Sequence, residues 1–268
     1  MRDWIRFASC LLVALAFLAA IFFGGASSAA AATWDRSPNT IIIQFNESGG
    51  LAAPQATQLP QWTLYGDGYL VWTTSGPATP GFSRRVWTGT LSDAQINELV
   101  ALADQLGFWS LRGSSGTGAA TTTSSGAQMI QVTPPDQRSG TLTFNLSDRR
   151  HSVQIYPAGS ASAPQAYRTL RDRLLATQPA NAAAFAPTSF RLQARSLGAA
   201  TGNRAQLAEW PFAEVSLANV ASRGATLNGT RGNEIGTFLI AQNYNARQGG
   251  IAYNVKLFGQ PPRPTTLR

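Results

Sequence analysis

The feature that most restricts the fold is an aromatic β-hairpin over Trp62–Trp72, with the sequence WTLYGDGYLVW. Two runs of aromatic and β-branched residues, which favour strands, flank the central GDG. Asp-Gly at a hairpin tip supplies the positive φ that a tight turn requires. With Asp-Gly as a two-residue turn, we expect Tyr65 opposite Leu70 and Leu64 opposite Val71. An isolated hairpin is only marginally stable, so this one needs further strands beside it.

The rest of the first region predicts those strands together with two helices. Ser92 and Gln95 form a capping box, and Gly107 stands at a left-handed stop, which predicts a helix over 93–106. A second helix is predicted over 164–176, with proline at its start. Short β-branched or alternating runs predict strands at 40–45, 84–90, 128–133, 141–147 and 152–156. We expect an α+β fold, an antiparallel β-sheet with two helices on one face.

The chain is expected to divide at the segment QPANAAAFAP, where the periodic signals weaken. This places an α+β domain at 38–178 and a smaller, mostly β C-terminal region at 188–260. Within the second region, 234–243 fits a strand or a helix equally well. The proline-rich end, 261–268, is predicted to be a flexible tail.

The N-terminus has the charged, apolar and small-residue order of a secretory signal. Arg2 and Arg6 precede an apolar run at 7–23, and a run of small residues ends at Ala32. We expect 1–32 to be a signal peptide or an uncleaved membrane anchor, because the apolar run matches the shortest spanning helices. If it is uncleaved, membrane contact is expected only through 7–23. Cys10 precedes most of the apolar run, which is the wrong place for a lipid-modified cysteine. Whether 1–32 is a cleaved signal peptide or an uncleaved anchor, we expect the rest of the chain to lie outside the cytoplasm.

Composition favours an extracytoplasmic surface and anionic partners. Charged residues make up 13% of the chain, about half the usual share. The formal net charge is +8 and falls by one when residues 1–32 are removed. Such a charge favours anionic surfaces. We expect an anionic envelope polymer, a glycan or a protein as partner, and no nucleic acid, because the basic residues are scattered.

Several catalytic classes lack their residues. Cys10, the single cysteine, lies within the apolar N-terminal run, so the mature chain is expected to have no disulfide and no thiol nucleophile. His151 is the single histidine, which excludes a multi-histidine metal site. His151 lies among arginines at a predicted turn, and no G-x-S-x-G motif is present. We therefore assign no catalytic residue, metal ligand or cofactor. A pair of carboxylates remains as an enzymatic alternative, with four candidates: Asp67, Glu47, Glu209 and Glu214.

An aromatic and basic surface is the main candidate for binding. Trp62, Trp72 and Trp87 fall on the hairpin and the strand after it, with Arg84 and Arg85 nearby. Aromatic rings on a sheet face can stack on sugars or peptides, and arginines can join them. The same rings also serve as ordinary cross-strand packing, so both readings stand.

The stretch LPQWTLYGDGYLVW, followed by RRVWTGTLSDAQINELVALADQLGFW, carries a resemblance to known sequences. It resembles exported proteins of actinobacteria and related high-GC bacteria that have no assigned activity. The later WPF at 210–212 and GGIAY at 249–253 are similar to that group as well. The resemblance implies an exported protein and carries over no catalytic residues.

Together these features predict a non-catalytic, extracytoplasmic binding or interaction protein of the bacterial cell envelope. One alternative is a carboxylate-dependent hydrolase that acts on envelope glycans. Another is a structural accessory subunit of an envelope complex.

Overall fold

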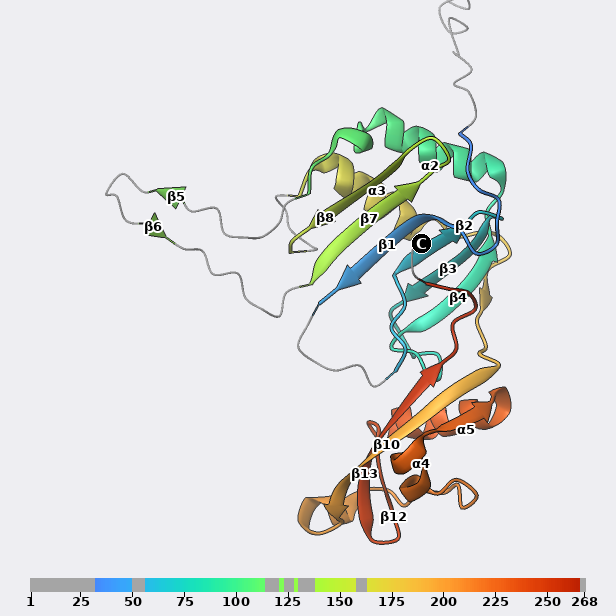
Figure 1. Ribbon diagram of the computed structural model, residues 1–268, viewed down its shortest axis with the longest axis vertical. Helices are drawn as coiled ribbons and strands as arrows, with labels where there is room; N and C mark the ends of the chain where they lie inside the picture. The colour runs from blue at the N-terminus through green and yellow to red at the C-terminus, as the bar shows by residue number, and fades with distance from the viewer. Residues whose placement is uncertain are drawn as a thin grey trace, which may run out of the picture. The chain divides into compact units, whose positions relative to one another are not determined.

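A computed structural model describes residues 32–49, 56–113, 121–122, 128–129, 138–157 and 163–265. The described residues from Thr33 onward belong to one compact unit. They form an α+β fold of antiparallel sheets and four α-helices, which confirms the predicted class (Figure 1). Within these ranges no helix is both long and apolar enough to span a membrane. Apart from Ala32, the predicted signal segment lies outside the described residues.

The first sheet has seven antiparallel strands in the order β8-β7-β1-β2-β3-β4-β9. Most of its buried positions hold apolar side chains, with Ile43, Leu64 and Phe144 fully buried. A separate pair, β5 (Thr121–Thr122) and β6 (Gln128–Met129), lies outside this sheet. The strands of the large sheet are β1 (Ile41–Ser48), β2 (Trp62–Tyr65), β3 (Tyr69–Thr74), β4 (Arg85–Thr90), β7 (Ser139–Asn145), β8 (Arg150–Ile155) and β9 (Ala183–Ala184).

The central hairpin forms, but the predicted register is wrong by one residue. Trp62 lies opposite Trp72, so Tyr65 does not pair with Leu70. The loop has three residues rather than two, because Gly68 adopts a φ of 83° and its N–H donates to the Tyr65 carbonyl at 2.9 Å. A turn followed by a left-handed glycine is the usual three-residue hairpin loop. A one-residue shift in register moves the side chains of one strand to the other face of the sheet. The observed register therefore determines which side chains of β2 and β3 lie opposite one another.

Two helices cover one face of this sheet (Figure 1). Helix α2 (Asp93–Gln105) begins at the predicted capping box, where Ser92 and Gln95 satisfy each other's backbone N–H groups. Its apolar stripe is buried, as is that of α3 (Gln165–Ala176). The short 3₁₀ helix η1 (Phe108–Ser110) follows α2 after a left-handed Gly107.

The second sheet has four antiparallel strands in the order β11-β10-β13-β12. Helices α4 (Leu217–Arg223) and α5 (Gly229–Ala241) bury Leu217 and Leu239 against its inner face. The segment 234–243, which fits a strand or a helix equally well in sequence, is helical up to Ala241. It forms the end of α5, where apolar residues recur at helical spacing. Its strands are β10 (Ser189–Ala199), β11 (Ala225–Asn228), β12 (Asn245–Gln248) and β13 (Ile251–Gly259), and the 3₁₀ helix η2 (Gly202–Gln206) follows β10.

Each of the two parts expected from the sequence contains one of the large sheets, but the segment between them is not a plain linker. Strand β9 lies inside the segment expected to be a junction, and it pairs with β4 at the edge of the first sheet. A close backbone contact also joins the two parts: Gly259 donates its N–H to the Gly81 carbonyl at 2.9 Å. Gly81 has a φ of 77°, and a Cβ built there would lie 2.5 Å from the Gly259 nitrogen. Only glycine fits such a position without strain.

The segment 261–265, expected to be part of a flexible tail, is bonded to the first sheet and its central hairpin. Tyr65 donates its hydroxyl to the Pro264 carbonyl at 2.7 Å, and Gln44 donates to the Thr265 carbonyl at 3.1 Å. Arg263 donates to a carboxyl oxygen of Asp67 at 2.7 Å. Prolines donate no backbone hydrogen bonds, so this segment is held by side chains that bond to its carbonyls. Residues 266–268 lie outside the described ranges.

Candidate ligand-binding cavity

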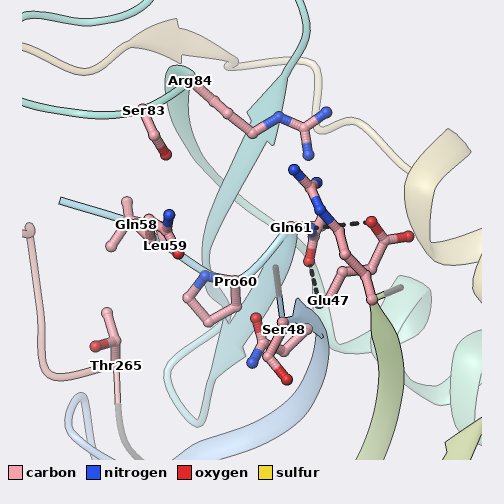
Figure 2. Close-up of a pocket in the computed structure, with 12 residues that line it drawn as sticks. Glu47, Ser48, Gln58, Leu59, Pro60, Gln61, Ser83, Arg84 and Thr265 are labelled. Atoms are coloured by element: carbon pink, nitrogen blue, oxygen red, sulfur yellow. Dashed lines mark hydrogen bonds between the residues drawn. The ribbon is translucent and has the colours of Figure 1, made fainter. Parts of the chain in front are cut away.

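A polar cavity of about 490 Å³ lies where β1 ends and β2 begins (Figure 2). Glu47 and Ser48 line it from the end of β1, and the segment before β2 contributes a second wall. Ser83 and Arg84 enter from the residues before β4, and Arg138 from the residue before β7. Thr265 of the C-terminal segment completes the lining. The cavity therefore joins five separate parts of the chain.

Glu47 is held in place by Gln61, which immediately precedes β2. The Gln61 side-chain oxygen accepts the Glu47 backbone N–H at 2.6 Å, and its amide nitrogen lies 3.5 Å from the Glu47 carboxylate (Figure 2). The paired register of β1 and β2 stops at Phe45 and Trp62, so Gln61 satisfies the next backbone group of β1 with its side chain. Gln61 is itself buried, which restricts the position of the carboxylate that it contacts.

Two arginines give this cavity an excess of positive charge. Among the described lining residues, Glu47 is the single carboxylate, whereas Arg84 and Arg138 are both cations. Neither arginine forms an ion pair within the described part of the chain; Arg84 reaches only the Ser75 hydroxyl, at 3.5 Å. Figure 2 shows Arg84 and Glu47 on different elements of the lining, with the Glu47 carboxylate next to the Gln61 amide. A guanidinium offers a fork of donors that matches a carboxylate or a phosphate.

Helix α3 carries a buried phenol, Tyr167. Burial raises the pKa of Tyr167 to about 12; the nearby Arg171 lowers that pKa, and the Glu47 carboxylate raises it. The Tyr167 hydroxyl is buried and has no hydrogen-bond partner in the described structure. The indole nitrogen of Trp62 is likewise buried and has no hydrogen-bond partner in the described structure. Neither side chain lines the cavity, so we assign neither to the site.

The structure separates the aromatic and basic residues that the sequence grouped together. Trp62, Trp72 and Trp87 form one row across β2, β3 and β4. Trp62 and Trp72 are 0% and 4% exposed, so these two rings pack in the core and present no surface to a ligand. Trp87 is partly exposed and stacks on Trp72 with ring centroids 6.3 Å apart.

The two neighbouring arginines of the predicted surface have different surroundings. Arg85 lies over the Trp87 ring, 4.5 Å from its centroid. Arg84 instead lines the cavity. Arg85 is the first residue of β4, whereas Arg84 lies in the bend before that strand. The predicted group is thus divided into a packed row, one arginine stacked on its edge, and one arginine in the cavity.

The other carboxylates proposed for catalysis are each engaged by an arginine. Asp67 contacts Arg263 at 2.7 Å. Glu209 contacts Arg247 at 3.0 Å, and Glu214 contacts Arg231 at 2.9 Å. Arg231 also binds Glu234, so Glu214 does have a second carboxylate near it, with the guanidinium between them. None of these carboxylates lines the cavity with Glu47.

His151 is partly buried rather than exposed at a turn. Its Nε2 lies 2.9 Å from the Leu111 carbonyl, and its ring meets Phe108 edge-on. The described residues contain no cluster of three or more histidine, cysteine, aspartate or glutamate side chains that could hold a metal ion.

The sequence did not identify most of the cavity. Arg138, Gln61 and Thr265 were not singled out, and they come from segments far apart in the chain. No local pattern marks such residues, since the fold alone brings them together. In comparisons with known proteins, no family model, no curated protein and no solved structure matches this chain.

Proposed function

We propose that this chain is a non-catalytic binding protein that takes a small anionic sugar, a sugar acid or a sugar phosphate, into the cavity beside Glu47. The supporting observation is that Arg84 and Arg138 line a polar cavity and form no ion pair in the described structure. An unpaired guanidinium in a recess attracts a carboxylate or phosphate, with which it forms short charge-assisted hydrogen bonds.

The rest of the lining favours hydroxyl groups on the same ligand. Glu47 can accept hydrogen bonds from hydroxyls, and Gln58 and Ser83 can donate or accept them. Leu59 and Pro60 are the main apolar side chains of the lining, which makes a mostly hydrocarbon ligand a poor match. The volume of about 490 Å³ is within the range of known small-molecule sites.

Binding without catalysis is favoured because the cavity offers a single described carboxylate. Glycoside hydrolysis usually requires two, about 5–10 Å apart on either side of the scissile bond. The other proposed carboxylates lie elsewhere, each against an arginine. We also propose that the protein acts outside the cytoplasm, at the cell envelope, on the basis of the signal-like segment 1–32.

Titration calorimetry with defined sugars tests the proposal. The probes are glucuronate, galacturonate and glucose 6-phosphate, with neutral glucose as the reference. We expect the matching anionic sugar to bind at least about tenfold more tightly than glucose, since a hydrogen bond to a charged group is worth about 1.5–3 kcal/mol. For the same reason, R84Q and R138Q should each weaken binding by about 10- to 100-fold.

The matched control is R112Q, which removes the same charge from an exposed arginine outside the cavity. It should leave the affinity unchanged. If R112Q weakens binding as much as R84Q does, the attraction is only the net charge of the protein and the assignment of the cavity is wrong. The assignment is also wrong if glucose binds as tightly as the anionic sugars.

A further inference from the structure

The second sheet has one face covered by helices and one open face, on which three cations have no carboxylate partner in the described chain. Phe190 and Leu192 of β10 point to the covered face and are buried in the core with α4 and α5. Because side chains alternate along a strand, Arg191 and Arg195 lie on the opposite face, where both are exposed. Lys256 of β13 lies opposite Gln193 and therefore shares that face.

The strand register places these cations in a regular line. Arg191 lies opposite Phe258, Lys256 opposite Gln193, and Arg195 opposite Asn254, which makes three successive rows on one face. Rows two residues apart on the same face are separated by roughly 7 Å, so the line spans on the order of 13 Å. The cations alternate between two neighbouring strands instead of clustering at one point.

No carboxylate neutralises this line within the described chain. The three acidic residues between 188 and 265 are Glu209, Glu214 and Glu234. Glu214 and Glu234 contact Arg231, and Glu209 contacts Arg247, which the register places on the same face opposite Ala252 but outside the line. Arg191, Arg195 and Lys256 have no ion pair in the described structure. The open face of the sheet therefore carries three uncompensated positive charges.

We propose that this face, defined by Arg191, Arg195 and Lys256, is a docking surface for a linear phosphate-bearing polymer. A chain with one phosphate per repeat can meet the three rows in succession. Arginine offers a fork of donors to phosphate, and lysine a mobile point charge. Gln193 and Thr226, which the register places beside Lys256 and Arg191, add neutral donors for the remaining phosphate oxygens.

The same face fits a membrane or a nucleic acid less well. Its one large apolar side chain in these rows, Phe258, is only partly exposed, so it offers neither an apolar anchor for lipid nor a stacking platform for bases. The surface shares no residue with the cavity beside Glu47. Failure of either proposal would consequently leave the other standing.

Binding of inorganic polyphosphate, measured by fluorescence anisotropy over a range of salt concentrations, tests the proposal. We expect log K to fall with log salt with a slope of about −2, from three phosphate contacts at about 0.7 each. The double variant R191Q/R195Q should lose on the order of 10- to 30-fold in affinity, and its slope should become shallower.

The matched control is R112Q/R223Q, which removes two charges from exposed arginines outside the line. Its affinity should stay within about twofold of the parent, and thermal unfolding should show that both double variants are folded. Equal losses in the two double variants would overturn the proposal, because net charge alone would then explain binding. Tighter binding to phosphatidylglycerol vesicles, oligothymidylate or polygalacturonate than to polyphosphate, at equal anion concentration, would also overturn it.

Discussion

Replacement of Arg263 by alanine should destabilise the fold more than removal of any single exposed ion pair. The Arg263 side chain donates to Asp67 at 2.7 Å and to the Pro38 carbonyl at 2.9 Å. Its guanidinium also lies over Tyr69, 4.1 Å from the ring centroid. The arginine and Asp67 side chains are only 22% and 33% exposed, so water competes weakly for these contacts. Arg263 thus adds to the contacts from Tyr65 and Gln44 that hold the segment 261–265 in place.

The loss can be estimated from the contacts. The charge-assisted hydrogen bonds contribute about 1.5–2 kcal/mol together after discounting for partial exposure. The stacking on tyrosine adds about 0.5–1 kcal/mol. R263A should therefore lower the free energy of unfolding by about 2–3 kcal/mol, and the melting temperature by roughly 5–10 °C for a unit of this size.

Urea unfolding followed by tryptophan fluorescence measures the change. The matched control is R36A, because Arg36 combines an ion pair with Asp93 and a contact over Trp34, but its pair is 58% and 61% exposed. That variant should lose less than about 1 kcal/mol. A loss in R263A no larger than that in R36A would refute the claim that the tail is anchored at this site.

Three further changes test other parts of the structure. G81A should cost more than about 1 kcal/mol in urea unfolding, because alanine is strained at positive φ and its Cβ would meet the Gly259 backbone; G76A, at positive φ in open space, should cost less. S92A should cost about 1 kcal/mol by removing the cap of α2, and a loss near zero would contradict the capping box. The pKa of Asp67 is lowered chiefly by the hydrogen bond from Arg263, so its stabilisation is present above the pKa of the unfolded chain and is lost as pH falls through the folded pKa. D67N should consequently differ from the parent at pH 7 and converge with it in acid; a difference that persists at low pH would contradict this cause.

Local signals predicted the parts of the fold that depend on neighbouring residues. The capping box at Ser92 and the glycine stop at Gly107 placed α2 almost to the residue. The hairpin was recognised from GDG, but its register was not. The difference between a two-residue and a three-residue loop depends on which residue takes positive φ, and here that residue is Gly68 alone.

Long-range contacts account for what the sequence could not predict. The cavity combines Glu47, Arg84 and Arg138 with the far end of the chain, and none of these positions carries a motif of its own. The predicted tryptophan surface failed for a related reason. The sequence places tryptophans on neighbouring strands, but it does not show whether that face of the sheet is exposed to solvent or covered. Trp62 and Trp72 are buried in the assembled fold, and no local pattern in the sequence reveals that burial.

The structure of this chain in complex with the tightest-binding anionic sugar would test the central claim most directly. We predict that the carboxylate or phosphate contacts the guanidinium groups of both Arg84 and Arg138, with a sugar hydroxyl donating to Glu47. A ligand bound elsewhere on the protein, or bound in the cavity with its anionic group turned away from both arginines, would contradict the proposed function.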